Sequence, residues 1–446
     1  MEATLQKAGQ QALDVMRKQG VEGEAFVLYA KELGIELTGG KVETLKEAEQ
    51  IGMGIRIMHK GRLGFSYTSD FSDFAVREGV ENAIRISAYT TPDEYHHLPD
   101  PVKNYPSVNT FDPMVEKISV EQKIQMAREV EEIAVAKDAR ICVVERAGYE
   151  DAIYSNLIMN TKGLYAYGKG SYCGLYIFLV AREDEDAQNG FSTMIKRKIS
   201  DLIPGQVGEE AAHKALRSLK ARTISSGNLP CIMEPQVAAR FLSLIGQTVE
   251  ADSVQKGKSM FAGKIGEKVA STAVNIVDDA LHEQGIGSFP FDAEGVISTK
   301  KPVISEGILN GFLYDTHCGL KEGKASTGNA QRGSFRSLPS VGTTNFILEL
   351  GTESPDKLQR QISKGLYITD VMGMHTANPI SGNFSVGASG IMIENGVLTY
   401  PVRGITIAGN LVQLFKDVDA VGNDVRFFGS KATPSLLLNH LSIGGE

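Results

Sequence analysis

Two-residue turns that join short apolar segments recur in both halves of this chain, and they constrain its fold more than any other feature. In the first half, Gly39-Gly40 and Lys60-Gly61 interrupt alternating apolar segments, and in the second half Asn395-Gly396 separates Ile391–Ile393 from Val397-Leu398. Such dipeptides adopt the positive φ angles that tight hairpins require. The sequence therefore predicts antiparallel sheets in both halves, with further turns at Asn160–Gly163, Gly168–Gly170, Glu306-Gly307 and Asn310-Gly311.

Segments with helical periodicity alternate with these strand-rich segments. Apolar residues recur every three or four positions near residues 5–16, 74–88, 118–133 and 207–220. At 446 residues the chain is longer than one hydrophobic core usually serves. We therefore expect an α+β protein of two domains, residues 1–222 and 223–446, each with a mostly antiparallel sheet flanked by helices. The small, polar stretch Thr223–Asn228 marks the boundary.

Three glycines, Gly382, Gly387 and Gly390, lie within strand-like sequence near the C-terminus. Glycines inside strands mark β-bulges or places where another backbone comes close. We expect bulges, and hence a strongly curved sheet in the second domain. Close approach of an extended peptide is the alternative explanation.

Prolines interrupt the sequence between Pro92 and Pro113. Prolines at this frequency prevent regular secondary structure, so the pattern predicts a long surface crossing. His96 and His97 lie in this crossing, and we expect both to be solvated.

The segment Pro235–Asp252 has the pattern of a half-buried helix. Its apolar residues follow three- and four-residue spacing, and its polar residues fall on the opposite side. Pro235 suits the first turn, where no backbone donor is needed. A narrow stripe of mostly small residues would let another backbone approach; it consists of Ala238, Ala239, Leu242 and Gly246.

Charge and cysteine usage exclude several classes of protein. The formal charge of −8 and the absence of a long basic run argue against a nucleic-acid-binding protein. No uncharged apolar run approaches the ~20 residues that span a bilayer, so we expect no membrane segment. The four cysteines form no Cys-x-x-Cys pair, which favours reduced thiols and a cytoplasmic location; they are Cys142, Cys173, Cys231 and Cys318.

Several segments of the second half match, in order and spacing, motifs of the TldD/PmbA family, whose older name is modulator of DNA gyrase. The chain resembles this family over essentially its whole length, more loosely in the first half. The matching segments are Phe291–Val296, Glu306–Gly311, Ser326–Ala330, Ser381–Ser385, Gly390–Gly396, Pro401–Arg403, Gly409-Asn410 and Gly422–Asp424.

The chain departs from the catalytic members of this family at the positions that hold zinc. Those members carry His-Glu-x-x-x-His on the helix that corresponds to Pro235–Asp252, where this chain has Leu242, Ser243 and Gln247. They also carry a cysteine in a Cys-Gly-Lys context, whereas the matching stretch Phe427–Lys431 has none. A zinc hydrolase needs about three protein ligands and a group that moves a proton. The pattern therefore resembles the PmbA/TldE branch, which lacks the zinc-binding motif.

The resemblance implies a function for this branch. Its members are metal-free partners of a TldD-type catalytic subunit, in a heterodimer that cleaves unfolded or small peptides. We accordingly expect no catalytic residue, metal or cofactor in this chain, zinc only in the partner, and a dimer. The candidate peptide-binding residues come from the matched segments; they are Ser326, Thr327, Gly328, Asn329, Ser381, Gly382 and Phe384. For Ser326 and Thr327 the alternative is a role in a turn or in capping the backbone.

Two other functions stay open. The first is a stand-alone metallopeptidase with relocated ligands. His282-Glu283 begins like a peptidase motif but no second histidine follows it, and His317, Cys318 and His375 are scattered. The second is a homodimeric peptide-binding protein without an enzyme partner.

Overall fold

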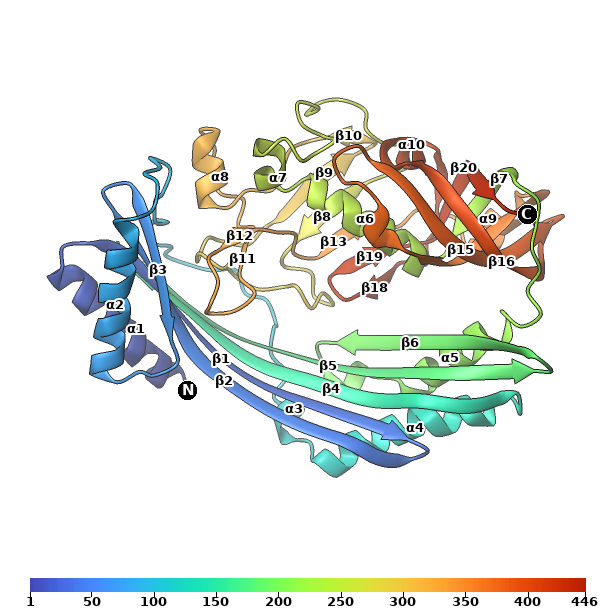
Figure 1. Cartoon of the computed structure of the whole chain (residues 1–446), viewed down its shortest axis with the longest axis horizontal. Coiled ribbons are helices and arrows are strands. Elements are labelled where there is room, and N and C mark those ends of the chain that lie inside the picture. Colours follow the sequence, from blue (N-terminus) through green and yellow to red (C-terminus); the bar gives the residue numbers. More distant parts are fainter.

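The N-terminal half forms one curled antiparallel sheet of very long strands (Figure 1). The computed structural model describes residues 1–446. The strand order is β3-β2-β1-β4-β5-β6, and the expected turns at Gly39-Gly40 and Lys60-Gly61 are confirmed by their positive φ angles. The strands are β1 (Glu22–Thr38), β2 (Lys41–His59), β3 (Arg62–Thr68), β4 (Ile141–Asn160), β5 (Tyr165–Glu183) and β6 (Asp186–Lys196).

Helices cover the convex face of this sheet in two groups (Figure 1). Helices α1 (Glu2–Lys18) and α2 (Asp73–Ser87) cover one end, and α4 (Val120–Ala136) and α5 (Pro204–Leu216) cover the other. Because side chains alternate along a strand, Val27 and Ile35 of β1 point to the helices, whereas Phe26 points to the C-terminal half. The shorter α3 (Met114–Lys117) and the 3₁₀ turn η1 (Ile199–Asp201) complete this half.

The C-terminal half contains a closed barrel. Strands run in the order β16-β15-β14-β7-β20, and pairing of β16 with β20 closes the ring. The hairpin at Asn395-Gly396 is confirmed, with φ of 53° and 75°, and a register shift at Ala388/Gly390 confirms a bulge. The strands are β7 (Gly227–Met233), β14 (Lys364–Met372), β15 (Asn383–Glu394), β16 (Val397–Asn410) and β20 (Leu436–Gly444), with β17 (Val418–Val421) beside β20.

A second sheet packs beside the barrel, and helix α6 (Pro235–Thr248) joins the two. The strand order is β10-β9-β8-β13-β19-β18. Helix α6 contacts β7 and β14 of the barrel and β13, β18 and β19 of the second sheet, so its apolar residues join both in one core. The strands are β8 (Ile276–Asp279), β9 (Lys300–Ser305), β10 (Ile308–Leu309), β13 (Phe346–Leu348), β18 (Arg426–Phe428) and β19 (Lys431–Thr433).

Short elements fill the remaining C-terminal sequence. They are α7 (Ala251–Gln255), α8 (Thr316–Lys321), α9 (Pro355–Arg360), α10 (Leu411–Lys416), the 3₁₀ turn η2 (Met374–Thr376) and the two-stranded ribbon of β11 (Ala330–Gln331) and β12 (Ser340–Val341).

Three expectations need correction. No turn forms at Gly168–Gly170, because β5 runs through it; these glycines leave room for the rings of Phe289 and Tyr154. Asn310-Gly311 follows β10 and joins no hairpin. Strong curvature was expected only in the second domain, yet the N-terminal sheet also curls around the C-terminal half (Figure 1).

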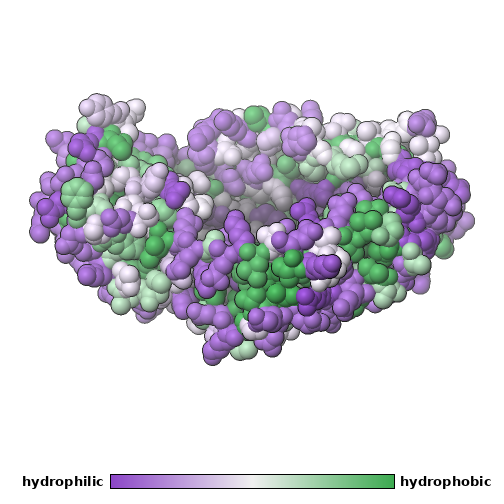
Figure 2. Space-filling model, turned by 60° about the horizontal axis from the view of Figure 1, so that its bottom comes forward, coloured by the Kyte–Doolittle hydropathy of each residue, from purple (hydrophilic) through white to green (hydrophobic).

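Figure 2 shows the side of the molecule that the helices cover. Hydrophilic side chains dominate this surface, and hydrophobic side chains form separate patches on it. None of the helices combines the length and the hydrophobicity that crossing a membrane would require.

Candidate functional site

Helix α6 and the hairpin β18–β19 are neighbours in the fold. The Thr433 hydroxyl donates a 2.6 Å hydrogen bond to the carbonyl oxygen of Pro235, which fixes β19 to the first turn of α6. In the turn of the hairpin, the Ser430 carbonyl accepts a hydrogen bond from the backbone N–H of Phe346. The structure therefore brings together the two segments at which the sequence departs from a zinc peptidase.

The three altered positions of α6 have different environments. Leu242 is 0% exposed and belongs to the core between the barrel and the second sheet. The Ser243 hydroxyl donates to the carbonyl of Ala239, one turn earlier in the same helix, at 2.8 Å. Gln247 is exposed. An aliphatic side chain in the core, an internally bonded hydroxyl and an exposed amide do not form a zinc site.

A lysine and a glutamate lie near this helix instead. Lys431 Nζ is 2.6 Å from Thr343 Oγ1 and faces the Phe346 ring. Burial lowers the pKa of Lys431, against the opposing effect of Asp278 and Glu250. Burial also raises the pKa of Glu250 to about 7, although the charge of Lys431 opposes this shift. A half-buried ammonium group disfavours a second cation beside it.

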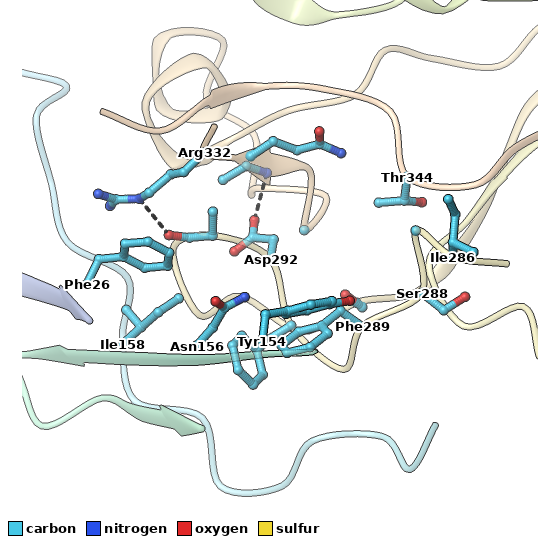
Figure 3. A pocket seen from close by; sticks show the side chains of 17 residues that line it. Phe26, Tyr154, Asn156, Ile158, Ile286, Ser288, Phe289, Asp292, Arg332 and Thr344 are labelled. Carbon is cyan, nitrogen blue, oxygen red and sulfur yellow. Dashed lines mark hydrogen bonds between the residues drawn. The ribbon is translucent and has the colours of Figure 1, made fainter. Parts of the chain in front are cut away.

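A cavity of about 220 Å³ lies between the concave face of the N-terminal sheet and loops of the C-terminal half (Figure 3). Phe26 and Tyr154 line it from the sheet, and Phe289, from a loop of the C-terminal half, stacks on Tyr154 with ring centroids 6.0 Å apart. At one end, Arg332 Nε donates to the carbonyl of Ala293 at 3.1 Å. Aromatic walls with convergent polar groups are typical of a binding pocket, and this volume suits one side chain better than a whole peptide.

Polar groups in the same cavity are mostly engaged by the protein itself. One carboxylate oxygen of Asp292 accepts the N–H of Ala330, and the other accepts the N–H groups of Glu294 and Val296. The side-chain oxygen of Asn156 has no hydrogen-bond partner. Asn156 therefore offers a ligand an unused hydrogen-bond acceptor.

The residues named as candidate peptide binders lie in two separate places. Gly328 lines the aromatic cavity. Ser326 and Thr327 both donate to the carbonyl of Tyr314, and the amide of Asn329 donates to Asp278, so these three side chains hold the local chain in place.

The second group lies at the start of barrel strand β15. The ring of Phe384 packs edge-on against Phe241 of α6, with centroids 5.1 Å apart. Gly382 has φ of 77°, and the carbonyl of Ser381 accepts a hydrogen bond from Asn410. No hydrogen bond joins the two groups.

The crossing between α2 and α3 contributes to a cluster that sequence analysis missed. His96 is half-buried, not solvated as expected, and its ring stacks on His317 with centroids 4.9 Å apart. His317 Nε2 lies 2.9 Å from Asp93 Oδ2. Burial alone would raise the pKa of Asp93, but hydrogen bonds from His317 and from the N–H of Tyr95 hold it at about 2. The Asp93-x-x-His96 spacing was the available signal, but the third member lies 224 residues away from Asp93.

Sequence models of one family match nearly the whole chain. Residues 23–87 match the PmbA/TldA metallopeptidase domain 1, residues 114–219 the central domain, and residues 226–445 the C-terminal domain. A crystal structure from Thermotoga maritima MSB8, described as a candidate modulator of a DNA gyrase, superposes with a TM-score of 0.91 at 31% identity. The match covers 98% of this chain and 99% of the Thermotoga maritima chain. The chain belongs to the PmbA/TldD metallopeptidase family.

Two further relatives place the chain within the family. Metalloprotease PmbA of Escherichia coli O157:H7 is 27% identical over 446 residues, covering 99% of this chain and 96% of that protein. TldE from Thermococcus kodakarensis has a TM-score of 0.90 at 23% identity, with both chains fully covered, which shows a shared fold. The chain is a PmbA/TldE-like member of this family.

Proposed function

We propose that this chain is the non-catalytic subunit of a TldD/TldE-type metallopeptidase. The observation that carries the proposal is Leu242, whose side chain is fully buried in the core at the position where catalytic relatives would present the first histidine of the zinc motif. A residue packed there cannot be exchanged for a metal ligand without disturbing the barrel.

The neighbouring hairpin supports the same proposal. Its stretch Phe427–Lys431 contacts α6 through β18 and β19 and carries no cysteine thiolate for a metal. The catalytic zinc would then bind only in a TldD-type partner, and this chain would help to enclose unfolded or small peptides. Hollows between the two halves supply surface for such a role, including a polar one of about 600 Å³ lined by Lys196, Lys198 and Glu283.

The location that goes with this function is the cytoplasm. Cysteine usage supports it, because all four cysteines are free and three of them are buried. Free buried thiols are typical of a reducing compartment.

The experiment is reconstitution with the TldD-type protein of the same genome. Each chain alone and the two co-expressed are assayed against unfolded and short peptides, and complex formation is followed by size-exclusion chromatography with light scattering. We expect hydrolysis only from the co-purified pair, and its loss when the partner's motif glutamate is replaced. A partner that is fully active without this chain, or that never binds it, would refute the proposal.

A stand-alone metallopeptidase is the second candidate, and the Asp93, His96 and His317 cluster is the observation that favours it. Chelator-sensitive hydrolysis by this chain alone, abolished by His317→Ala, would replace the first proposal. A stable homodimer that binds peptides without cleaving them, and that ignores a TldD-type protein, would favour a peptide-binding protein instead.

A further inference from the structure

Asp93, His96 and His317 place three metal-binding side chains in one half-buried cluster. One ligand atom of each lies within 4.8 Å of the others. Asp93 and His96 belong to the crossing between α2 and α3, and His317 lies in the first turn of α8. Two imidazoles and one carboxylate are a ligand set that transition metals use, whereas Mg²⁺ and Ca²⁺ prefer oxygen ligands alone.

We propose that these three side chains form a Zn²⁺ site that joins the N-terminal half to the C-terminal half. Zinc with bonds of about 2.0–2.1 Å and tetrahedral geometry separates its ligand atoms by roughly 3.3 Å. Asp93 Oδ2 and His317 Nε2 are 2.9 Å apart, and no pair exceeds 4.8 Å. Side-chain adjustments of roughly 1.5 Å or less therefore bring all three into coordination.

Backbone hydrogen bonds already hold the carboxylate in a suitable orientation. The N–H of Asp93 donates to the carbonyl of Gly61 at 2.7 Å, and the N–H of His96 donates to the carbonyl of Asp93 at 3.3 Å. The N–H of Tyr95 occupies Asp93 Oδ1 at 2.9 Å. Oδ2 is thus the oxygen directed to His317, as a monodentate ligand would be.

The third ligand is fixed by the N-terminus of its helix. Asp315 caps α8 by accepting the N–H of Cys318 at 2.7 Å, and the N–H of Thr316 donates to Glu294 at 2.9 Å. His317 therefore stands on a segment whose backbone is held from two sides. Preorganised ligands of this kind lose little freedom when a metal binds.

Lys321 supplies the positive charge in this structure. Its ammonium lies 3.4 Å from Asp93 Oδ2, one helical turn after His317. The side chain is 36% exposed, so it can move into solvent when a divalent cation replaces it.

His97 and Thr316, which are the chain neighbours of two ligands, line a hollow of about 430 Å³. A water or another small ligand can reach the fourth coordination position from there.

The test is metal binding by the intact chain after dialysis against metal-free buffer. Co²⁺ titration followed by visible absorption reports four-coordinate binding, and competition with Zn²⁺ then gives its affinity. We expect one ion per chain and a rise in the melting temperature on loading, because the ion binds only the folded protein. Asp93→Asn, His96→Ala and His317→Ala should each weaken binding by roughly tenfold or more, since even groups that only support ligands contribute roughly 10–100-fold.

Loss of binding can also result from misfolding, so the test also needs a variant that is expected to bind more tightly. Lys321→Met should strengthen binding, because it removes the competing ammonium and leaves the three ligands in place. His375→Ala is the histidine control and should bind like the parent chain. No stoichiometric binding, binding unaffected by His317→Ala, or binding weakened equally by His375→Ala would refute the site. These measurements need neither a partner nor peptidase activity. They can therefore refute the metal site without refuting the proposed function, and the reconstitution experiment can refute the proposed function without refuting the metal site.

Discussion

The guanidinium of Arg56 and the carboxylate of Glu294 meet at 2.7 Å, although strand β2 carries the first and a loop of the C-terminal half carries the second. Arg56 also lies 2.8 Å from Glu24 of β1, and Glu24 pairs with Arg332 from the C-terminal half. All four side chains are almost completely buried. This network ties the curled sheet to the opposite half of the molecule.

Removing Arg56 should therefore destabilise the whole protein. Arg56→Met leaves Glu294 buried without its cation, and loss of one partner from a buried pair costs ~3–5 kcal/mol. The free energy of unfolding from urea titration is the measurement. Arg140→Met is the control, because Arg140 pairs with Asp138 and Glu183 in a more exposed site and should hardly shift the midpoint. Equal shifts for both variants would show that the buried network contributes no more to the free energy of unfolding than the more exposed ion pairs of Arg140.

Restoring the histidines of the zinc motif should affect positions 242 and 247 differently. Leu242→His places an imidazole in an apolar core and should cost ~2–5 kcal/mol, the range for loss of a buried leucine. Gln247→His changes an exposed position and should stay within about 0.5 kcal/mol. Neither should create zinc-dependent hydrolysis, because α6 also lacks the motif glutamate. Activity in the Leu242→His variant would overturn this account of α6.

Stability should respond to pH through Glu250. Burial raises the pKa of Glu250 to about 7 in the folded protein, against about 4.3 for an unfolded glutamate. Between these values the folded state binds more protons than the unfolded state, so the contribution of Glu250 to stability is lost as pH rises through this window. Melting temperatures of the parent chain and Glu250→Gln should diverge as pH rises from about 4.3 to about 7 and stay parallel above it. Parallel curves throughout would contradict the raised pKa.

Thiol reactivity should separate one cysteine from the other three. Cys142 is exposed, whereas Cys173, Cys231 and Cys318 are buried. Burial raises the pKa of both Cys173 and Cys231 to about 12, so little thiolate forms near neutral pH. Ellman's reagent should find one fast thiol in the native chain, and Cys142→Ser should remove it. Rapid reaction of two or more thiols in native conditions would show that the core opens.

Local signals predicted much of the secondary structure. The turns at Gly39-Gly40, Lys60-Gly61 and Asn395-Gly396 were predictable because positive φ angles strongly favour glycine and asparagine. The turn expected at Gly168–Gly170 was wrong, because those glycines make room for Phe289 of a distant segment and for Tyr154 of the neighbouring strand β4. A glycine needed for such a close approach looks the same in sequence as a glycine needed for a turn.

Some features of the candidate site were likewise predictable from the sequence, and others were not. The sequence by itself determined that α6 lacks zinc ligands, because the identity of a side chain decides whether it can coordinate a metal. Only the tertiary structure decided that Leu242 is a core residue, that Arg56 meets Glu294, and that His96 and Asp93 lie beside His317. Those contacts join segments hundreds of residues apart, and their formation depends on how the curled sheet wraps the C-terminal half, which no local pattern encodes.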